Sequence, residues 1–422
     1  MSALPTLSRS RRAAVLAGMG ALLATVVLSG CSFFHYHSAA KKPKVDKKAA
    51  DKPAVLVPFV NHIDVKRVWT TSIAGEKPKL RVSLRAAADD DHVFIASYKG
   101  ELEELSLGTG KRVWSARLKA PLSAGPSVAA GMVVVGSSKG EVIAVRESDG
   151  TALWRAHINA EILAAPAVND ELVVVRGVDG RIHGLSAKDG SENWSVDEQV
   201  PKLSMRGTSA PLLSGDLAIC GFDNGRVVAI NSHSGTTVWD FAVGQAHGST
   251  ELARLIDVNA PVIGEGDELF AAAFQGRVAH LKRETGEALW TRDLSSYRGM
   301  ALDASRLYVS NGDDSVTALD RQNGTEQWSQ KALARRQITA PTVFGGYVVV
   351  ADADGVIHWL DAGTGDFVAR AQVGKSVPRK GVESQKISYK RRVTAEPLVA
   401  GDLLLVFSDA GTLSAFRAQP AP

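Results

Sequence analysis

The chain of 422 residues carries a formal net charge of +4, and hydrophobic residues make up 45% of it. Seven units of positive charge lie within the first 60 residues, so the remaining body has a charge of about −3. A slightly acidic body lacks the basic surface that nucleic-acid binding requires, which removes the only compositional support for that class of function.

The first 30 residues have the pattern of a secretory signal peptide. Three arginines precede the uncharged apolar stretch 13–28, which is short for a membrane-spanning helix but typical of a signal. The segment ends in LSGC, which resembles the bacterial lipobox, and this resemblance implies that Cys31 is lipidated and begins the mature protein. Ser32 follows in place of an aspartate that would signal inner-membrane retention, which implies sorting to the outer membrane. The alternative is an ordinary cleaved signal with a cysteine there by chance.

Residues 31–60 are predicted to form the lipidated cysteine and a flexible, lysine-rich tether. The stretch 38–54 contains six lysines, two aspartates and two prolines, and it shows no apolar periodicity. With Cys31 occupied by lipid, Cys220 has no cysteine partner within the chain, which excludes an internal disulfide. Its apolar neighbours in DLAICGF predict a buried thiol on a strand.

From residue 61 onward the chain repeats one phrase, of which KGEVIAVRESDGTALW is an example. A glycine is followed ten residues later by a second glycine and fourteen residues later by a tryptophan, as in Gly140, Gly150 and Trp154. The tryptophans of the complete phrases are Trp114, Trp154, Trp194, Trp239, Trp290 and Trp328. Their spacings of 38 to 51 residues indicate one supersecondary unit per repeat. Short Val/Ile/Leu runs between Asn-Asp and Asp-Gly turn signals make each unit a set of strands.

Two incomplete phrases at the ends of this region complement each other. The segment around Trp69 has only the tryptophan half, and the segment around Gly411 has only the glycine half. A ring closes without a free sheet edge if the first strand completes the last blade. We therefore predict an all-β, eight-bladed β-propeller of four-stranded repeats over residues 61–422, with the N-terminal strand joining the C-terminal blade.

The repeated phrase resembles the propeller repeat first known from pyrroloquinoline quinone (PQQ) enzymes. Eight such repeats behind a lipobox resemble more specifically the BamB family, the propeller lipoproteins of the outer-membrane β-barrel assembly machinery. This resemblance covers essentially the whole mature chain. It implies a non-enzymatic, lipid-anchored scaffold that faces the periplasm as a monomer within a hetero-complex. Its partners would be BamA, other subunits of the machinery and unfolded outer-membrane proteins.

The main alternative from another class is a PQQ-dependent quinoprotein oxidoreductase. The resemblance to those enzymes would imply a disulfide of adjacent cysteines near the quinone, and this chain has no cysteine pair. Seven tryptophans occupy the repeat position and Trp359 lies in the strand GVIHWL, so packing between blades accounts for all eight. His35 and His37 give two metal ligands without a third. We expect no catalytic, cofactor-binding or metal-binding residue.

Two long connections at consecutive blade junctions, residues 195–211 and 240–261, form the best candidate binding surface. Binding residues concentrate on loops that a rigid scaffold positions, and arginine with exposed aliphatic groups suits an interface. The family resemblance implies that the BamA-contacting residues, which face its POTRA domains, are Leu203, Met205, Arg206, Asp257 and Asn259. Asn259 stands where the family pattern has an acid, which puts an ionic contact there in doubt. In the alternative interpretation Leu203 and Met205 fill the propeller mouth while Arg206 pairs with Asp257.

Two further possibilities follow from the sequence. The propeller could bind a peptide or glycan at its central mouth, which is a third class of function. The insertion 375–392 carries seven lysines and arginines against one glutamate. It could be a basic flap that reaches anionic headgroups or an acidic partner, or a solvated loop.

Overall fold

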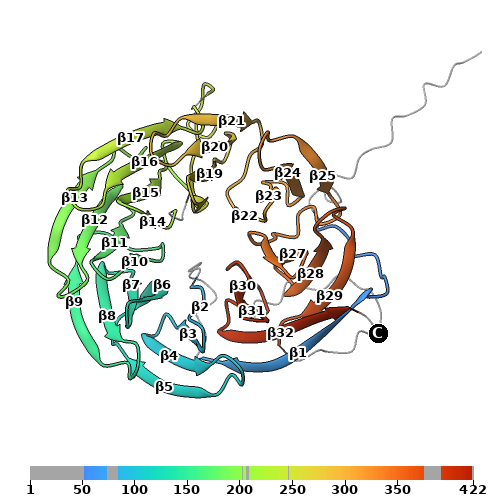
Figure 1. The fold of residues 1–422 in the computed structure, drawn as a ribbon, viewed down its shortest axis with the longest axis horizontal. Coiled ribbons are helices and arrows are strands. Elements are labelled where there is room, and N and C mark those ends of the chain that lie inside the picture. Colours follow the sequence, from blue (N-terminus) through green and yellow to red (C-terminus); the bar gives the residue numbers. More distant parts are fainter. Residues whose placement is uncertain are drawn as a thin grey trace, which may run out of the picture. The chain divides into compact units, whose positions relative to one another are not determined.

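The structure, a computed structural model, describes residues 52–73, 84–201, 203–205, 209–245, 247–374 and 391–420. Cys31, Arg206 and most of the basic insertion lie outside the described residues. Within them, 32 strands form eight four-stranded antiparallel sheets, which stand as blades around a common axis (Figure 1). None of the described segments forms a helix with the length and hydrophobicity needed to span a bilayer.

Each blade runs from an innermost first strand to an outermost fourth strand, and the blades are numbered here in chain order. The strands of blades 1 to 4 are β2 (Ala87–Ala88), β3 (His92–Ala96), β4 (Glu101–Ser106) and β5 (Arg112–Arg117); β6 (Leu122–Ala129), β7 (Met132–Ser137), β8 (Glu141–Arg146) and β9 (Ala152–His157); β10 (Ala167–Val168), β11 (Leu172–Arg176), β12 (Arg181–Ser186) and β13 (Glu192–Asp197); and β14 (Leu212–Ser214), β15 (Leu217–Gly221), β16 (Arg226–Asn231) and β17 (Thr237–Ala242). Those of blades 5 to 8 are β18 (Ile263–Glu265), β19 (Glu268–Ala272), β20 (Val278–Lys282) and β21 (Ala288–Arg292); β22 (Gly299–Leu302), β23 (Arg306–Ser310), β24 (Val316–Asp320) and β25 (Glu326–Gln330); β26 (Thr342–Phe344), β27 (Tyr347–Ala351), β28 (Val356–Asp361) and β29 (Phe367–Gln372); and β30 (Leu398–Ala400), β31 (Leu403–Phe407), β32 (Thr412–Pro420) and β1 (Ile63–Ser72).

The ring closes in blade 8, where the first strand of the chain pairs with the last. β1 lies antiparallel to β32 from the pair Ile63–Pro420 to the pair Ser72–Thr412. In Figure 1 the blue strand β1 lies along the red strand β32 at the rim. The predicted eight-bladed propeller with an N-terminal strand in the last blade is therefore confirmed.

The middle strands of the blades form the core, because each blade is covered by a neighbour on both faces. All five residues of β11, LVVVR, are buried, and so are all five of β15, LAICG. Cys220 is a free, buried thiol on β15, as the sequence predicts. Burial raises the pKa of this thiol to about 12, so it stays protonated and unreactive.

A β-bulge interrupts the outermost strand of every blade, one residue before the repeat position of the tryptophan. In blade 2, for example, Ala144 pairs with Trp154 and Val145 pairs with Ala152, which leaves Leu153 as the extra residue. The corresponding register shifts occur in all eight blades. Bulges twist an edge strand and disrupt its hydrogen-bonding row, so they protect the rim against pairing with other chains.

Each repeat tryptophan links its blade to the next one. Its indole Nε1 donates a hydrogen bond of 2.7–3.0 Å to a backbone carbonyl of the following blade. Its ring covers the second glycine of that blade's phrase, where a Cβ would collide with the indole. The pairs are Trp69–Gly110, Trp114–Gly150, Trp154–Gly190, Trp194–Gly235, Trp239–Gly286, Trp290–Gly324 and Trp328–Gly365. The glycine and the tryptophan of the phrase are thus two halves of one contact, made between successive blades.

Blade 7 departs from this pattern in a way that the ring closure explains. Its outer strand has Ala369 at the tryptophan position, and Ala369 pairs with the fully buried Trp359 on β28. In blade 2, by comparison, the outer strand carries Trp154 and the third strand carries Ala144 opposite it, so in blade 7 the large and small residues have changed places. The Trp359 ring packs edge-on against Phe416 of blade 8. Blade 8 has no turn between its third and fourth strands, since β1 comes from elsewhere in the chain. An indole at position 369 would therefore have no glycine turn to cover.

Candidate partner-docking surface

Two connections at the junctions of blades 3 to 5 carry the residues that the sequence singled out. The first joins β13 to β14 and presents Leu203, whose side chain is 45% exposed. The second joins β17 to β18 and presents Leu252, which is 68% exposed. A local turn shapes the second connection, because the hydroxyl of Thr250 accepts a hydrogen bond of 3.1 Å from the backbone N–H of Ala253. Each connection thus holds an aliphatic side chain in solvent.

Asp257, in the second connection, is hydrogen-bonded to the first connection. Its side chain is fully buried, and its Oδ2 accepts a hydrogen bond of 3.3 Å from the backbone N–H of Met205. The backbone carbonyl of Asp257 accepts a bond of 2.8 Å from the N–H of Phe274 in blade 5, and the N–H of Val258 donates to Phe222 of blade 4 at 3.0 Å. The segment around Asp257 is therefore fixed between two blades, and it holds the first connection two residues from Leu203.

A buried ion pair between Arg176 and Asp223 interacts electrostatically with Asp257. Arg176, at the end of β11, donates a hydrogen bond of 2.6 Å to Asp223, and both side chains are almost fully buried. The guanidinium also lies 4.8 Å from the centre of the Phe222 ring. Oδ1 of Asp257 and two nitrogens of Arg176 have no hydrogen-bond partner within the described part of the chain. The structure thus places one cation and two carboxyl groups beneath the candidate surface.

This environment raises the pKa of Asp257 to about 7, first through burial and next through the negative charge of Asp223. Arg176 and the Met205 N–H act in the opposite direction. Near neutral pH the Asp257 carboxyl therefore exists in both forms, and only the ionised form gives the Met205 N–H a charge-assisted acceptor.

The structure brings Met205 and Asp257 into contact, and the predicted residues differ in how far they are exposed. Leu203 is exposed, Met205 and Asn259 are half-buried, and Asp257 is buried. Asp257 is thus placed to position the Met205 backbone, whereas the side chain of Leu203 extends into solvent. The sequence did not single out Arg176 as part of this site. An arginine that ends an otherwise apolar strand was the available signal, because a buried guanidinium needs a buried acid.

The pKa of Asp257 predicts a pH dependence of stability that one substitution should remove. Between about pH 4 and pH 7 the folded protein holds a proton that the unfolded chain releases, so raising the pH through this window lowers the free energy of unfolding. Asp257→Asn cannot ionise, so its stability relative to the wild type should rise across the window, on the order of 2–4 kcal/mol. Urea unfolding of both proteins at several pH values measures this difference. A difference that stays constant with pH would contradict the raised pKa.

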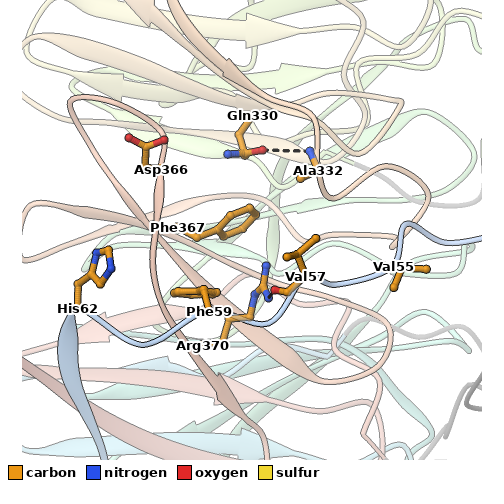
Figure 2. A pocket seen from close by; sticks show the side chains of 9 residues that line it. All are labelled: Val55, Val57, Phe59, His62, Gln330, Ala332, Asp366, Phe367 and Arg370. Carbon is orange, nitrogen blue, oxygen red and sulfur yellow. Dashed lines mark hydrogen bonds between the residues drawn. The ribbon is translucent and has the colours of Figure 1, made fainter. Parts of the chain in front are cut away.

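A separate cavity of about 440 Å³ opens between the outer strands of blades 6 and 7 (Figure 2). The residues that line it are Val55, Val57, Phe59, His62, Gln330, Ala332, Asp366, Phe367 and Arg370. None of the predicted partner-binding residues belongs to this lining. In the described part of the chain, no group of three or more His, Cys, Asp or Glu side chains is arranged to hold a metal ion.

Comparison with known proteins identifies the family. The family model described as outer membrane protein assembly factor BamB matches residues 98–330 and 306–421. A relative of that name from Pseudomonas aeruginosa is 44% identical over 364 residues, which cover 86% of this chain and 92% of the relative. The crystal structure of BamB from Moraxella catarrhalis has a TM-score of 0.73 at 27% identity and covers 84% of this chain and 100% of that one. A quinohemoprotein alcohol dehydrogenase from Comamonas testosteroni, 13% identical with a TM-score of 0.64, covers 84% of this chain and 76% of its own and shares the fold alone. The chain therefore belongs to the BamB family of outer-membrane protein assembly factors, as its repeat and lipobox predict.

Proposed function

We propose that the protein docks on the POTRA domains of BamA through its two connections at blades 3 to 5, and thereby assists the folding and insertion of outer-membrane proteins. The observation that carries this proposal is the hydrogen bond from Met205 to the buried Asp257. It fixes the loop that presents Leu203, so the exposed leucine is offered on a preorganised backbone. Preorganisation lowers the entropy that binding must remove from an interface loop.

The protein acts in this proposal from the periplasmic face of the outer membrane, held there by lipid on Cys31. Residues 1–30 serve as the lipoprotein signal and residues 31–60 as the anchor and tether. Its role is adhesive: the propeller holds BamA, and with it nascent barrel proteins, in a productive arrangement. Family membership agrees with an assembly factor and not with the quinoprotein oxidoreductase that shares the repeat.

Substitution of Leu203 tests the docking surface. Recovery of BamA with tagged Leu203→Glu protein from detergent-solubilised outer membranes should fall at least about tenfold, since a charge replaces an apolar contact at the interface. Arg206→Glu, the neighbouring candidate, should have a similar effect. Both variants must keep the unfolding midpoint of the wild type.

Leu153→Glu provides a matched control. Leu153 is 42% exposed, close to the value for Leu203, but it lies on the outer strand of blade 2. It should recover BamA as the wild type does. Equal recovery with all variants would move the interface away from these loops, and failure of the wild type to recover BamA would refute the proposed partner.

A further inference from the structure

The residues that precede β1 run along the rim of the propeller as a strap, defined here as residues 52–62. Its first part is held by the connection that follows β25. The backbone N–H of Ala54 donates to the carbonyl of Ala334 at 2.9 Å, and Nη1 of Arg336 donates to the carbonyl of Ala54 at 3.0 Å. Arg335 donates to the carbonyl of Lys52 at 3.0 Å. The strap is thus attached to the propeller before the first strand begins.

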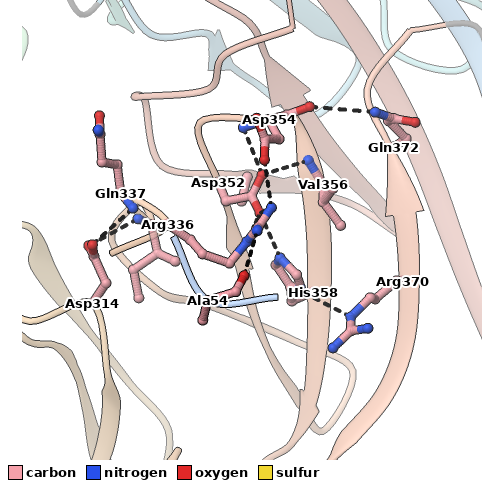
Figure 3. A network of polar contacts seen from close by, with 12 residues as sticks. Ala54, Asp314, Arg336, Gln337, Asp352, Asp354, Val356, His358, Arg370 and Gln372 are labelled. Atoms are coloured by element: carbon pink, nitrogen blue, oxygen red, sulfur yellow. Dashed lines mark hydrogen bonds and ion pairs between the residues drawn. The ribbon is translucent and has the colours of Figure 1, made fainter. Parts of the chain in front are cut away.

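A buried polar network fixes the side chain that holds Ala54 (Figure 3). Arg336 is bonded to Asp352 at 2.7 Å and to Asp354 at 2.8 Å, and His358 contacts Asp352 at 3.1 Å. Asp352 and His358 are fully buried. Since every group in this chain of contacts is held by another, Arg336 presents its remaining donor to the strap in a fixed position.

The second part of the strap lies against blade 7. Nη1 of Arg370 donates to the carbonyl of Val57 at 2.6 Å, and its guanidinium lies within 4.7 Å of the ring centres of both Phe59 and Phe367. Figure 2 shows the two rings and the guanidinium gathered among the lining residues, between His62 and Val57. The N–H of His62 then donates to the carbonyl of Val368 on β29 at 2.7 Å. The strap therefore follows the outer edge of blade 7 as a fixed extended chain.

This fixed strap exposes apolar side chains to an unusual degree. Val55 is 75% exposed, Val57 73% and Val60 82%, which makes them the three most exposed large hydrophobic residues in the described part of the chain. Leu56 points the other way and packs against the core between blades 6 and 7. Val55 and Val57 line the open cavity of Figure 2, and all three valines keep most of their surface in solvent. Clustered exposed apolar residues of this kind mark an interaction site.

The position of the strap in the chain indicates what covers the valines. Twenty residues separate Lys52 from the predicted lipid attachment at Cys31, and a chain of this length spans at most ~75 Å. The strap is therefore the described segment that the anchor restrains most closely. A short tether also raises the effective concentration of a surface next to its anchor, so a weak affinity suffices. Six lysines between positions 41 and 52 add attraction to anionic headgroups.

We propose that the strap is a membrane-contact site, at which Val55, Val57 and Val60 insert into the interfacial region of the bilayer that holds the anchor. The edge formed by blades 6 and 7 then faces the membrane, and the docking connections lie at the preceding blades 3 to 5. A lipid anchor alone leaves the propeller free to rotate, whereas an anchor with a second apolar contact fixes one edge toward the bilayer. The proposed docking on BamA does not depend on this contact.

Vesicle binding of the unacylated protein tests the proposal. The mature chain with Cys31→Ser is mixed with vesicles of phosphatidylethanolamine and phosphatidylglycerol, and the bound fraction is measured by flotation. The wild-type strap should bind, and the triple variant Val55→Ser, Val57→Ser, Val60→Ser should lose about tenfold or more in partitioning, since three exposed aliphatic groups are removed. Thermal unfolding of both proteins verifies that the fold is kept.

The rim of the propeller supplies a matched control. Val113, Leu153 and Val238 are the exposed bulge residues of blades 1, 2 and 4, and they are 42–53% exposed. Replacing these three by serine should leave vesicle binding unchanged. Binding that is equally weak in both triple variants, or equally strong in the strap variant and the wild type, would overturn the proposal. So would the absence of any binding, or binding that high salt abolishes while the valine variant leaves it intact, because lysines alone would then be responsible.

The membrane contact of the strap and the docking on BamA can be tested independently of each other. Loss of BamA recovery in the strap variant with unchanged vesicle binding would make the strap a protein-docking surface and overturn its membrane role. Loss of vesicle binding in the strap variant with normal BamA recovery supports the membrane contact, whatever the Leu203→Glu variant does.

Discussion

Gly190→Ala is expected to destabilise the propeller by about 3 kcal/mol, through strain and overpacking together. Gly190 has a φ of +75°, and a Cβ there would lie 2.5 Å from Cε3 of Trp154 in the preceding blade. Trp154 cannot withdraw, because its Nε1 is bonded to the carbonyl of Ala187 at 2.8 Å and its ring is buried. Urea unfolding followed by tryptophan fluorescence measures the loss.

Gly131→Ala separates the two contributions. Gly131 has almost the same φ, +74°, but a Cβ there would meet nothing within 4 Å. This control should lose only the roughly 1 kcal/mol that a left-handed residue other than glycine costs. Equal losses at both positions would show that backbone strain alone requires the repeat glycine, and the tryptophan contact would then be incidental.

Asp223→Ala is expected to lower the free energy of unfolding by about 3–5 kcal/mol, because it leaves the buried guanidinium of Arg176 without its counter-ion. The two side chains are 1% and 4% exposed and 2.6 Å apart, so water cannot replace the missing carboxylate. Chemical unfolding with the wild type as reference measures the effect. The loss should also loosen the Asp257 segment, since Val258 is bonded to the residue next to Asp223.

An exposed ion pair within blade 3, the blade that carries Arg176, provides the control. Arg181 and Asp197 are 3.1 Å apart but are 52% and 63% exposed, so Asp197→Ala should cost less than about 1 kcal/mol. The double variant Arg176→Leu, Asp223→Leu should recover most of the stability that Asp223→Ala loses. A loss in Asp223→Ala no larger than that in Asp197→Ala would mean that the buried pair is solvated in solution.

Much of the fold was predictable because a repeat multiplies weak local signals. One Gly–Trp phrase is ambiguous, but six of them at regular spacing and a seventh repeat with Ala369 at the tryptophan position fix the blade count. The two half-phrases at Trp69 and Gly411 fix the closure. The sequence could not show which blade each contact joins. Gly184, for example, pairs with Trp194 on the next strand of its own blade and leaves room for that indole, a contact that no local pattern of the sequence defines.

The candidate site was predictable only in part, for a related reason. Loop length and composition identify Leu203 as a candidate contact, and its exposure agrees with that role. The pKa of Asp257 depends on its burial and on the charges of Asp223 and Arg176, which lie on different blades and 47 residues apart. No local pattern connects them, because the ring alone brings them together. The contacts of Arg206 and Asn259 with a partner stay predictions.

The pairing of β1 with β32 constrains how the protein matures. Ile63 meets Pro420 across the sheet, so a strand made early must wait for the strand made last before blade 8 exists. Until then β1 has no strand to pair with, and the first and last blades of the unclosed ring each leave one face uncovered. Non-local pairing of this kind is slow compared with the local hairpins that build each blade. A chain that emerges in the order of its sequence therefore cannot close its ring before its last strand is available, however early the other blades form.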